Sequence, residues 1–337
     1  MNATMSLEKI KHYPVMLNQV LSIISPQHGG TFIDCTFGGG GYSHAILKFK
    51  GTKVLATDRD KLTQKHAKSL EKKFPERFNF FQEKFSNLNK IAKEKLYPKA
   101  IIFDLGLSSL QLFDKERGFS FESDNLLNME MGINKNSAYD VVNNLDKEHL
   151  ATIIKVLGDE KDGKIIANKI DKYRRRKKIK TSKELSSIIK SAKKSYSYYK
   201  KNPATKTFQA IRMFVNQELS ELMLGLIEAS KVLSEGGIII VVSFHSLEDK
   251  IVKNFFNLYS NIQKNPSRYL PIEEKKSSLF KTVLKKPLVP NAEEIEENNS
   301  SRSAKLRYAI RNNTPFFYPK EFINKFGNYL KLEGSQV

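Results

Sequence analysis

The chain of 337 residues contains one cysteine and no tryptophan. A single thiol excludes a disulfide framework and a zinc site built on several cysteines. No apolar run approaches the ~18 residues that a membrane-spanning helix needs. The first residues also lack the continuous apolar stretch of a secretory signal. These absences predict a cytoplasmic protein without a membrane partner.

Acidic residues are scarce relative to basic ones. Asp and Glu number 36 against 57 Lys and Arg, so the formal net charge is +21. Such an excess favours a polyanionic partner, nucleic acid before a membrane surface. At ~100–200 residues per domain, the length predicts two domains or one large one.

Short apolar runs alternate with helical patterns in the first hundred residues. These runs are too short for helices and rich in β-branched and aromatic residues, which predicts strands. They cover residues 31–34, 53–57, 78–82 and 100–105, and a fifth run covers 237–244. Strands that alternate with helices indicate a parallel sheet covered on both faces. The predicted fold class is therefore α/β and doubly wound.

The long gap between the fourth and fifth runs has helical signals. Asp146 fits an N-cap and Gly158 a stop, while Thr181 and Glu184 fit a capping box. One long amphipathic stretch follows, over 208–226. These patterns predict a helical insert that interrupts the sheet and lets it resume.

The expected division is a discontinuous domain of residues 1–111 and 208–337, with an inserted helical domain of residues 112–207. The segment 260–301 is polar and contains four prolines. We expect it to be a long loop or a flap.

Positive charge is concentrated between Lys169 and Lys201, where 14 Lys and Arg face two acids, Asp171 and Glu184. Cations bind phosphates and aromatic rings stack on bases. A solvated helix face is the alternative interpretation, but the basic chain favours contact with RNA or DNA. The tyrosines interleaved with these cations are Tyr173, Tyr196, Tyr198 and Tyr199.

A glycine-rich loop, Gly38–Gly41, follows the first predicted strand and its terminal Asp34. Glycines let the backbone approach a ligand closely and point its amides at it. The dinucleotide fingerprint is incomplete, because Ser43 stands at its third glycine position. Asp58 ends the second strand and fits a ribose acceptor. NAD and S-adenosylmethionine both stay open, with the latter favoured; a flexible turn with a surface Asp is the plain alternative.

Polar residues also follow the fourth strand. In a doubly wound sheet the carboxyl ends of the strands face the ligand crevice. A carboxylate there fits an acceptor for an exocyclic amine, and a helix N-cap is the alternative. The residues expected to line the crevice are Asp104, Ser108, Ser109 and Gln111.

The fifth strand leads to Phe244 and His245 at the same edge. We expect Ser246 and Asp249 to cap the next helix. His245 then faces the crevice, where it is a second candidate for a chemical role.

Eight segments occur in a fixed order: HYPVML, TFIDCTFGGGGYS, ATDRD, DLGLSSLQLFDKERGFSF, NPATKTFQAIRMFVNQEL, GGIIIVVSFHSLEDKIVK, KKPLVP and SRSAKLRYAIR. Together they closely resemble the bacterial small-subunit rRNA cytosine-N4 methyltransferase family, from His12 to Arg311. The resemblance implies a class I S-adenosylmethionine-dependent methyltransferase fold, Rossmann-like, with a helical, basic insert for substrate recognition. It also implies the substrate, a cytidine in the decoding region of 16S rRNA (position 1402 in standard numbering). Naked rRNA and RNA within the small ribosomal subunit both stay open, and the basic patch and the long flap favour the subunit.

The family's cofactor contacts carry over by motif to Gly40, Gly41, Tyr42, Asp58, Phe85, Asp104 and Gln111. In the family pattern Asp58 binds the ribose, and Phe85 lies near the adenine. Tyr42 stands where His is usual. The segment Leu127–Gly132 reads Leu-Asn-Met-Glu-Met-Gly, where the family usually has Leu-Asp-Met-Arg-Met-Asp.

The expected reaction is transfer of a methyl group to the cytosine amine. Asp104 is the first candidate for the acceptor that activates this amine, and His245 or a backbone carbonyl is the second. Phe244 is a candidate for stacking on a splayed-out base, with core packing as the alternative. The cations expected to bind RNA are Arg174, Arg175, Arg176, Lys177 and Lys178. No metal-ligand cluster is expected, and the oligomeric state stays open.

Two other functions stay in view. One is a non-catalytic ribosome-assembly factor that binds rRNA, which the altered Asn128–Gly132 segment favours. The other is a methyltransferase that acts on DNA or protein amines. The fourth strand speaks against DNA amines, because it continues as Asp104-Leu-Gly-Leu and lacks an Asp/Asn-Pro-Pro-aromatic loop.

Overall fold

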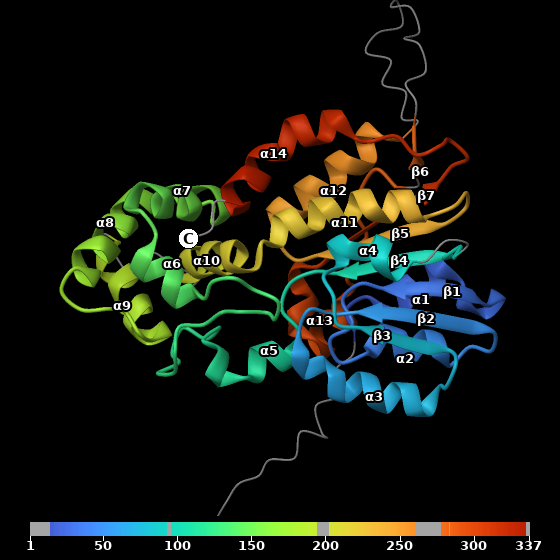
Figure 1. Cartoon of the computed structure of the whole chain (residues 1–337), viewed down its shortest axis with the longest axis horizontal. Coiled ribbons are helices and arrows are strands. Elements are labelled where there is room, and N and C mark those ends of the chain that lie inside the picture. Colours follow the sequence, from blue (N-terminus) through green and yellow to red (C-terminus); the bar gives the residue numbers. More distant parts are fainter. Residues whose placement is uncertain (1–13, 93–95, 194–201, 261–277, 283, 335–337) are drawn as a thin grey trace, which may run out of the picture. The chain divides into compact units, whose positions relative to one another are not determined.

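A computed structural model describes residues 14–92, 96–193, 202–260, 278–282 and 284–334 (Figure 1). The chain divides into two compact units. The first comprises residues 1–109 and 227–318, and the second comprises residues 110–226 and 319–337. Among the described helices, none has both the length and the apolar character needed to span a membrane.

The first unit is built on a seven-stranded sheet in the order β3–β2–β1–β4–β5–β7–β6. Strands β1 to β5 are parallel, whereas β7 is antiparallel to both of its neighbours. This order, with a reversed β7, is the class I Rossmann-like arrangement, which confirms the predicted fold class. The strands are β1 (Gly30–Asp34), β2 (Thr52–Thr57), β3 (Phe78–Phe81), β4 (Ala100–Asp104), β5 (Ile238–Ser243), β6 (Phe280–Thr282) and β7 (Lys305–Arg311).

The five predicted strands correspond to β1–β5 with ends that agree to within one residue. Strands β6 and β7 were not predicted. Cations stand at three of the seven positions of β7, and its buried residues do not alternate strictly with exposed ones. Its sequence therefore lacks the period of two that marks a half-buried strand.

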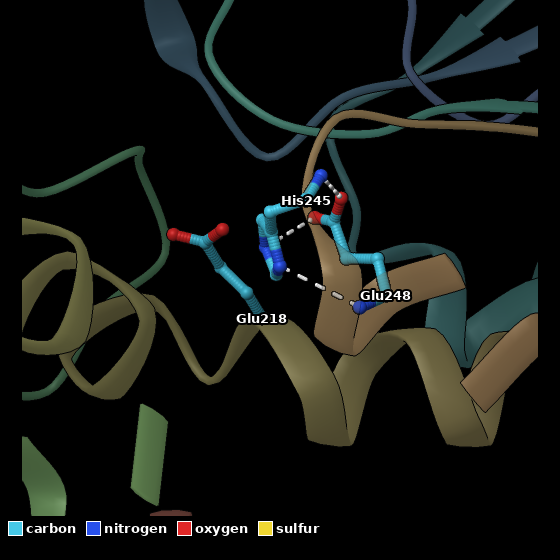
Figure 2. A group of neighbouring side chains, drawn as sticks. All are labelled: Glu218, His245 and Glu248. Atoms are coloured by element: carbon cyan, nitrogen blue, oxygen red, sulfur yellow. Dashed lines mark hydrogen bonds and ion pairs between the residues drawn. The ribbon is translucent and has the colours of Figure 1, made fainter. Parts of the chain in front are cut away.

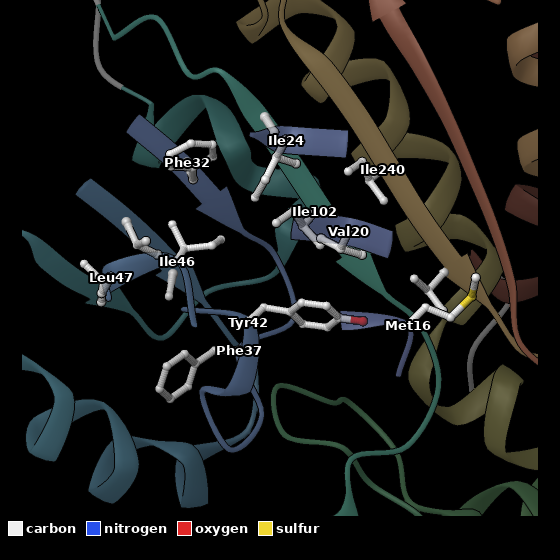
Figure 3. Packing of buried hydrophobic residues seen from close by; sticks show 14 of the residues in the cluster. Met16, Val20, Ile24, Phe32, Phe37, Tyr42, Ile46, Leu47, Ile102 and Ile240 are labelled. Atoms are coloured by element: carbon white, nitrogen blue, oxygen red, sulfur yellow. The ribbon is translucent and has the colours of Figure 1, made fainter. Parts of the chain in front are cut away.

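The helices of the first unit are α1 (Leu17–Ile24), α2 (Gly41–Leu47), α3 (Gln64–Lys73), α4 (Leu88–Ile91), α12 (Ser246–Leu258) and α13 (Ala292–Glu297). Val20 and Ile24 of α1 belong to one buried cluster with Ile46 of α2 and with Phe32 and Ile102 of the sheet (Figure 3). Each fully buried aliphatic or aromatic side chain contributes roughly 1.5–3 kcal/mol. This core holds the strand ends that carry the polar residues.

The prediction of a loop or flap over 260–301 was wrong for part of that segment. Residues 261–277 lie outside the described residues, but 280–282 form β6 and 292–297 form α13. Asn291 caps α13 by accepting a hydrogen bond from the Glu294 backbone N–H at 2.9 Å. The helix is short and rich in glutamate, so it lacks the apolar period that predicts a helix.

The second unit is helical. Asp146 accepts hydrogen bonds from the N–H groups of Glu148 and His149, and Thr181 forms a capping box with Glu184, which confirms both predicted caps. Its helices are α5 (Ser109–Phe113), α6 (Ala138–Asn144), α7 (Lys147–Leu157), α8 (Gly163–Arg174), α9 (Ser182–Ala192), α10 (Thr205–Asn216), the first part of α11 (Glu218–Val232) and α14 (Lys320–Gly334).

The amphipathic stretch over 208–226 is two helices, because Gln217 adopts a left-handed conformation (φ 52°) between α10 and α11. Helix α10 packs against α6 and α7. The Glu333 carboxylate of α14 accepts hydrogen bonds from the N–H groups of Leu219 (3.3 Å) and Ser220 (2.7 Å). Residues 208–226 and 319–337 therefore group with the insert, whereas the sequence placed the insert at 112–207.

Candidate active site

The candidate site lies where the strand order of the sheet reverses. Strands β1 and β4 are neighbours, and the chain proceeds from them toward opposite edges through β2 and β5. Loops at such a switch point diverge and leave a crevice at the carboxyl ends of the strands. The backbone N–H of Asp104 donates to Thr36 Oγ1 at 2.7 Å, which joins the end of β4 to the loop after β1.

The glycine loop makes a tight turn into α2. Gly40 has a left-handed conformation (φ 80°), and a Cβ there would lie 2.7 Å from the Phe37 ring. A Cβ on Gly41 would collide with the ring of Pro14. A Cβ on Gly39 would meet no atom within 4 Å among the described residues. Glycine is therefore required at two positions by close packing, and the backbone at Gly39 has an open side.

Asp58 joins the end of β2 to this loop. Its Oδ2 accepts a hydrogen bond from the Gly38 N–H at 2.8 Å, and its Oδ1 accepts one from the Asp60 N–H at 2.8 Å. Burial raises the pKa of the Asp58 carboxyl to about 6, although these two hydrogen bonds oppose the shift. Each carboxylate oxygen accepts more than one hydrogen bond, so these contacts leave capacity for ligand hydroxyls.

Asp34 lies beneath the loop and is fully buried. Its carboxylate accepts hydrogen bonds from Ser43 Oγ at 2.6 Å and from the Thr36 N–H at 3.2 Å. Burial raises the pKa of Asp34 despite these bonds. The third glycine of the dinucleotide fingerprint is thus replaced by a serine that satisfies a buried carboxylate, and Asp34 supports the loop from inside.

The Tyr42 side chain belongs to the core. It is 3% exposed, and its hydroxyl donates a hydrogen bond to the Val15 carbonyl (Figure 3). This placement leaves only the Tyr42 backbone, in the first turn of α2, for contact with a ligand.

Asp104 is the last residue of β4, and its carboxyl group has an unusual environment at the carboxyl edge of the sheet. Its Oδ1 is buried and accepts no hydrogen bond from the described part of the chain. Burial, together with the charges of Asp34 and Glu248, raises the pKa of Asp104 well above its usual range. A buried acceptor without a donor is costly, so the group is suited to a donor that arrives with a ligand.

Phe85 begins a 3₁₀ turn (Phe85–Asn87) after β3. Its half-buried ring meets the fully buried Phe103 ring edge to face at 5.4 Å between centroids. Phe85 thus belongs to the same edge of the sheet as Asp58. Gln111 is buried and lies on α5, in the second unit.

His245 is itself the N-cap of α12, so the predicted cap at Ser246 was wrong. Its Nδ1 accepts a hydrogen bond from the Glu248 N–H at 3.5 Å, and Nε2 lies 3.0 Å from Glu248 Oε1 (Figure 2). Glu248 completes a capping box, because its side chain accepts hydrogen bonds from the N–H groups of Phe244 (2.9 Å) and His245 (3.4 Å). An Nδ1 that accepts from the helix places the proton of a neutral ring on Nε2.

Glu218, also drawn in Figure 2, begins α11 in the second unit. There its carboxylate pairs with Arg212, whose Nε and Nη2 each lie 2.8 Å from one of its oxygens.

Phe244 is half-buried and packs against the core cluster of the first unit. A Cβ on Gly106 would lie 3.5 Å from its ring, which is ordinary contact. This environment is the core packing that was weighed against base stacking.

The basic segment of the second unit contains one arginine with an internal role. Arg174 is 11% exposed, and its Nε and Nη2 donate to the Asp171 carboxylate at 3.1 and 2.9 Å. Its Nη1 donates to the Val142 carbonyl at 2.9 Å. Arg174 therefore ties α8 to α6 and has little surface left for RNA.

The four following cations are exposed. Arg175 also contacts Asp171 but has a side chain that is 74% exposed. Lys177 pairs with Glu184 at 2.8 Å and is 63% exposed. Lys178 donates to the Asn143 carbonyl at 3.3 Å, and Arg176 completes the set. Three of the interleaved tyrosines, Tyr196, Tyr198 and Tyr199, lie outside the described residues.

The segment Leu127–Gly132 is firmly held. Asn216 accepts a hydrogen bond from the Met131 N–H and donates one to the Met129 carbonyl, both at 2.8 Å. The residues of this segment that match the family pattern are buried, namely Leu127, Met129 and Met131. Those that depart from it are less buried, namely Asn128, Glu130 and Gly132.

Thr36 and Glu248 were not singled out by the sequence analysis. Thr36 joins the loops of β1 and β4, and Glu248 holds the turn after β5 and acts on the pKa of Asp104. Glu248 has a signal in hindsight, because a Glu three residues after an N-cap completes a capping box. Histidine is an uncommon N-cap, and the pattern therefore pointed to the next residue.

Comparison with known proteins agrees with these features. The profile described as the MraW methylase family matches residues 9–312. A relative from Parvibaculum lavamentivorans, named ribosomal RNA small subunit methyltransferase H, is 40% identical over 306 residues, which are 90% of each chain. A relative of the same name from Ehrlichia chaffeensis is 42% identical over 304 residues, 89% of this chain and 99% of its own. Among solved structures, an rRNA methylase from Streptococcus thermophilus aligns with 90% of this chain and 99% of its own, at 10% identity and a TM-score of 0.35. The assignment to a family therefore depends on the relatives found by sequence. The resemblance seen in the sequence is confirmed, and the chain belongs to the MraW methylase family.

Proposed function

We propose that this protein transfers a methyl group from S-adenosylmethionine to N4 of a cytidine in the decoding region of small-subunit rRNA. The family and the names of its relatives support rRNA methylation. One observation supports the cytosine amine as the group that is methylated. Asp104 Oδ1, at the carboxyl end of β4, is a buried acceptor that receives no hydrogen bond from the described residues.

The residues at the sheet edge suit this cofactor. Asp58 offers carboxylate oxygens for the ribose hydroxyls, and the open side of Gly39 lets a ligand approach the backbone. Gly40, Gly41 and Tyr42 contribute backbone groups at the start of α2. We assign Phe85 to the adenine side and Gln111 to closing the site.

When bound, S-adenosylmethionine supplies an activated methyl group on a sulfonium. The protein's part is to orient the amine, whose lone pair is delocalised into the ring. Asp104 Oδ1 accepts an N–H of this amine, which increases the electron density on nitrogen and balances the charge that develops there. In its ionised form the Asp104 carboxylate then takes the amine proton after the transfer.

We assign His245 a positioning role. The Nδ1 lone pair accepts from the Glu248 N–H and is thereby engaged in the cap of α12. Glu248 holds the backbone of Phe244 in the same turn. Together they fix the loop after β5 beside β4.

The second unit is proposed to hold the RNA. Arg175, Arg176, Lys177 and Lys178 form an exposed cationic set, which suits phosphate contacts. Arg174, which was expected among them, is assigned to the fold of this unit because its guanidinium is occupied by Asp171 and the Val142 carbonyl.

The test uses small ribosomal subunits from a strain without this activity. The purified protein is incubated with them and methyl-labelled S-adenosylmethionine, the RNA is cut into fragments of known position, and the labelled fragment is then digested to nucleosides. We expect label in N4-methylcytidine at one decoding-site position. Label in another nucleoside would overturn the proposed target, and tight binding without label would favour the assembly-factor function.

A further inference from the structure

Strand β7 brings a lysine to the carboxyl edge of the sheet. Because β7 is antiparallel to β5, its first residue, Lys305, pairs with Ser243, the last residue of β5. In the next row, Asp104 pairs with Val242, and Val242 with Leu306. Neighbouring strands are ~4.8 Å apart, so the backbones of Asp104 and Leu306 are about 10 Å apart. Lys305 therefore stands two strands from Asp104, at the edge where ligands bind.

A shared carboxylate holds Lys305 in place. Asp249 of α12 accepts a hydrogen bond from Arg307 Nε at 2.7 Å and from Lys305 Nζ at 3.3 Å. Lys305 and Arg307 are two residues apart on the strand, so both point to the same face. Burial alone would raise the pKa of Asp249, but the bond to Arg307 and the two positive charges hold it below its usual range.

The group formed by Asp249, Arg307 and Lys305 is not electrically neutral. Two cations share one carboxylate, which leaves one positive charge in excess. Arg307 and Asp249 are 11% and 14% exposed, whereas Lys305 is 41% exposed. Arg307, which is less exposed than Lys305, is the close partner of Asp249, and Lys305 presents the surplus charge to solvent. An ammonium has three donors, and the bond to Asp249 uses one of them.

A second segment pairs with the start of β7. Leu288 and Leu306 exchange two backbone hydrogen bonds, each 2.9 Å long. The bridge is antiparallel, so the exposed Lys285 and Lys286, which precede Leu288, lie toward the middle of β7 and not beside Lys305.

We propose that Lys305 binds a backbone phosphate of the RNA beside the methylated cytidine, and that Asp249 and Arg307 position it. This inference rests on the proposed function and deepens it. Lysine binds phosphate as a compact point charge, and a phosphate contact fixes the register of a nucleic acid without reading its sequence. The contact would hold the RNA strand in place while the target base enters the site beside Asp104.

The test compares Lys305→Met, which keeps the apolar stem, with Lys305→Arg, which keeps the charge. Lys281→Met is the matched control, because Lys281 is exposed and lies on β6 opposite Ile310, near the other end of β7. Binding of each variant to small subunits is measured over a range of salt concentrations. Initial methylation rates and S-adenosylmethionine affinity are measured in parallel.

For Lys305→Met we expect KM for the subunit to rise about tenfold, as the loss of one charge-assisted contact predicts. The slope of log K against log salt should fall by ~0.7–0.9, the share of one phosphate. The kcat and the cofactor affinity should stay within twofold, and Lys305→Arg should restore most of the loss.

Equal behaviour of Lys305→Met and Lys281→Met, in KM and in salt slope, would overturn the inference. A loss of cofactor affinity in Lys305→Met would also overturn it, because it would indicate a structural role. Failure of the wild-type protein to label cytidine would refute the proposed function separately, since the salt slope still reports the phosphate contact.

Discussion

Asp58 should make cofactor affinity depend on pH. Burial at the end of β2 raises the pKa of its carboxyl to about 6, even though the N–H groups of Gly38 and Asp60 donate to it. Ribose hydroxyls donate more strongly to a carboxylate than to a carboxylic acid. The ionised form is therefore the one that binds S-adenosylmethionine, and binding should weaken as the pH falls through 6.

The size of the effect follows from this pKa. At pH 5 about one Asp58 carboxyl in eleven is ionised, so the apparent Kd should rise about tenfold between pH 7 and pH 5. The effect on the stability of the ligand-free fold has the opposite sign, because the folded state holds the proton more tightly than the unfolded state does. This contribution is fully present below pH ~4 and is lost as the pH rises through 6, at a cost of up to ~3 kcal/mol.

Calorimetric titration of S-adenosylmethionine at pH 5, 6 and 7, in buffers of different ionisation enthalpy, measures both affinity and proton release. The wild-type protein should release part of a proton per cofactor near pH 6. Asp58→Asn should bind about tenfold more weakly at pH 7, with an affinity that does not change with pH. Asp124→Asn, which alters an exposed carboxylate of the second unit, is the control. A wild-type affinity that is flat from pH 5 to 7, without proton release, would refute the reasoning.

Three further substitutions test other parts of the account. Arg174→Ala should lower the free energy of unfolding by ~2–3 kcal/mol, because it removes a largely buried ion pair with Asp171 and a bond to a carbonyl; a thermal unfolding curve like that of the wild type would contradict this. Arg175→Ala, at a 74% exposed side chain, should leave unfolding unchanged and reduce the affinity for small subunits and its salt slope; binding like that of the wild type would argue against a phosphate contact. Tyr42→Phe should cost ~1 kcal/mol of stability, seen in denaturant unfolding, and leave cofactor affinity unchanged, since its hydroxyl bonds the Val15 carbonyl; weaker cofactor binding would place the hydroxyl in the site.

The strands and several caps could be predicted because their signals are local. Runs of β-branched and aromatic residues mark β1–β5, and side-chain oxygens before apolar periods mark the starts of α7 and α9. The cations of β7 obscure the alternation of polar and apolar residues that predicts a strand. The presence of Lys305 and Arg307 is explained only by their hydrogen bonds to Asp249, which lies on another element. The information for that pairing is distributed over more than fifty residues of sequence.

The candidate site was predicted by residue type better than by role. Asp58 and Asp104 lie at strand ends, as the doubly wound pattern requires. The sequence does not distinguish Tyr42 facing the core from a side chain that faces the crevice, since both are compatible with the first turn of a helix. The run of cations likewise does not show that Arg174 is the buried member, because this depends on Asp171 and on the carbonyl of Val142.

The central claim is that Asp104 Oδ1 accepts the amine of the target cytosine. Single-turnover methylation of small subunits by Asp104→Asn, at saturating cofactor and subunit, tests it most directly. We predict a fall in rate of about 10²–10⁴-fold, the range of general acid–base contributions, with cofactor affinity kept within a few fold. A rate within twofold of the wild type would contradict the claim.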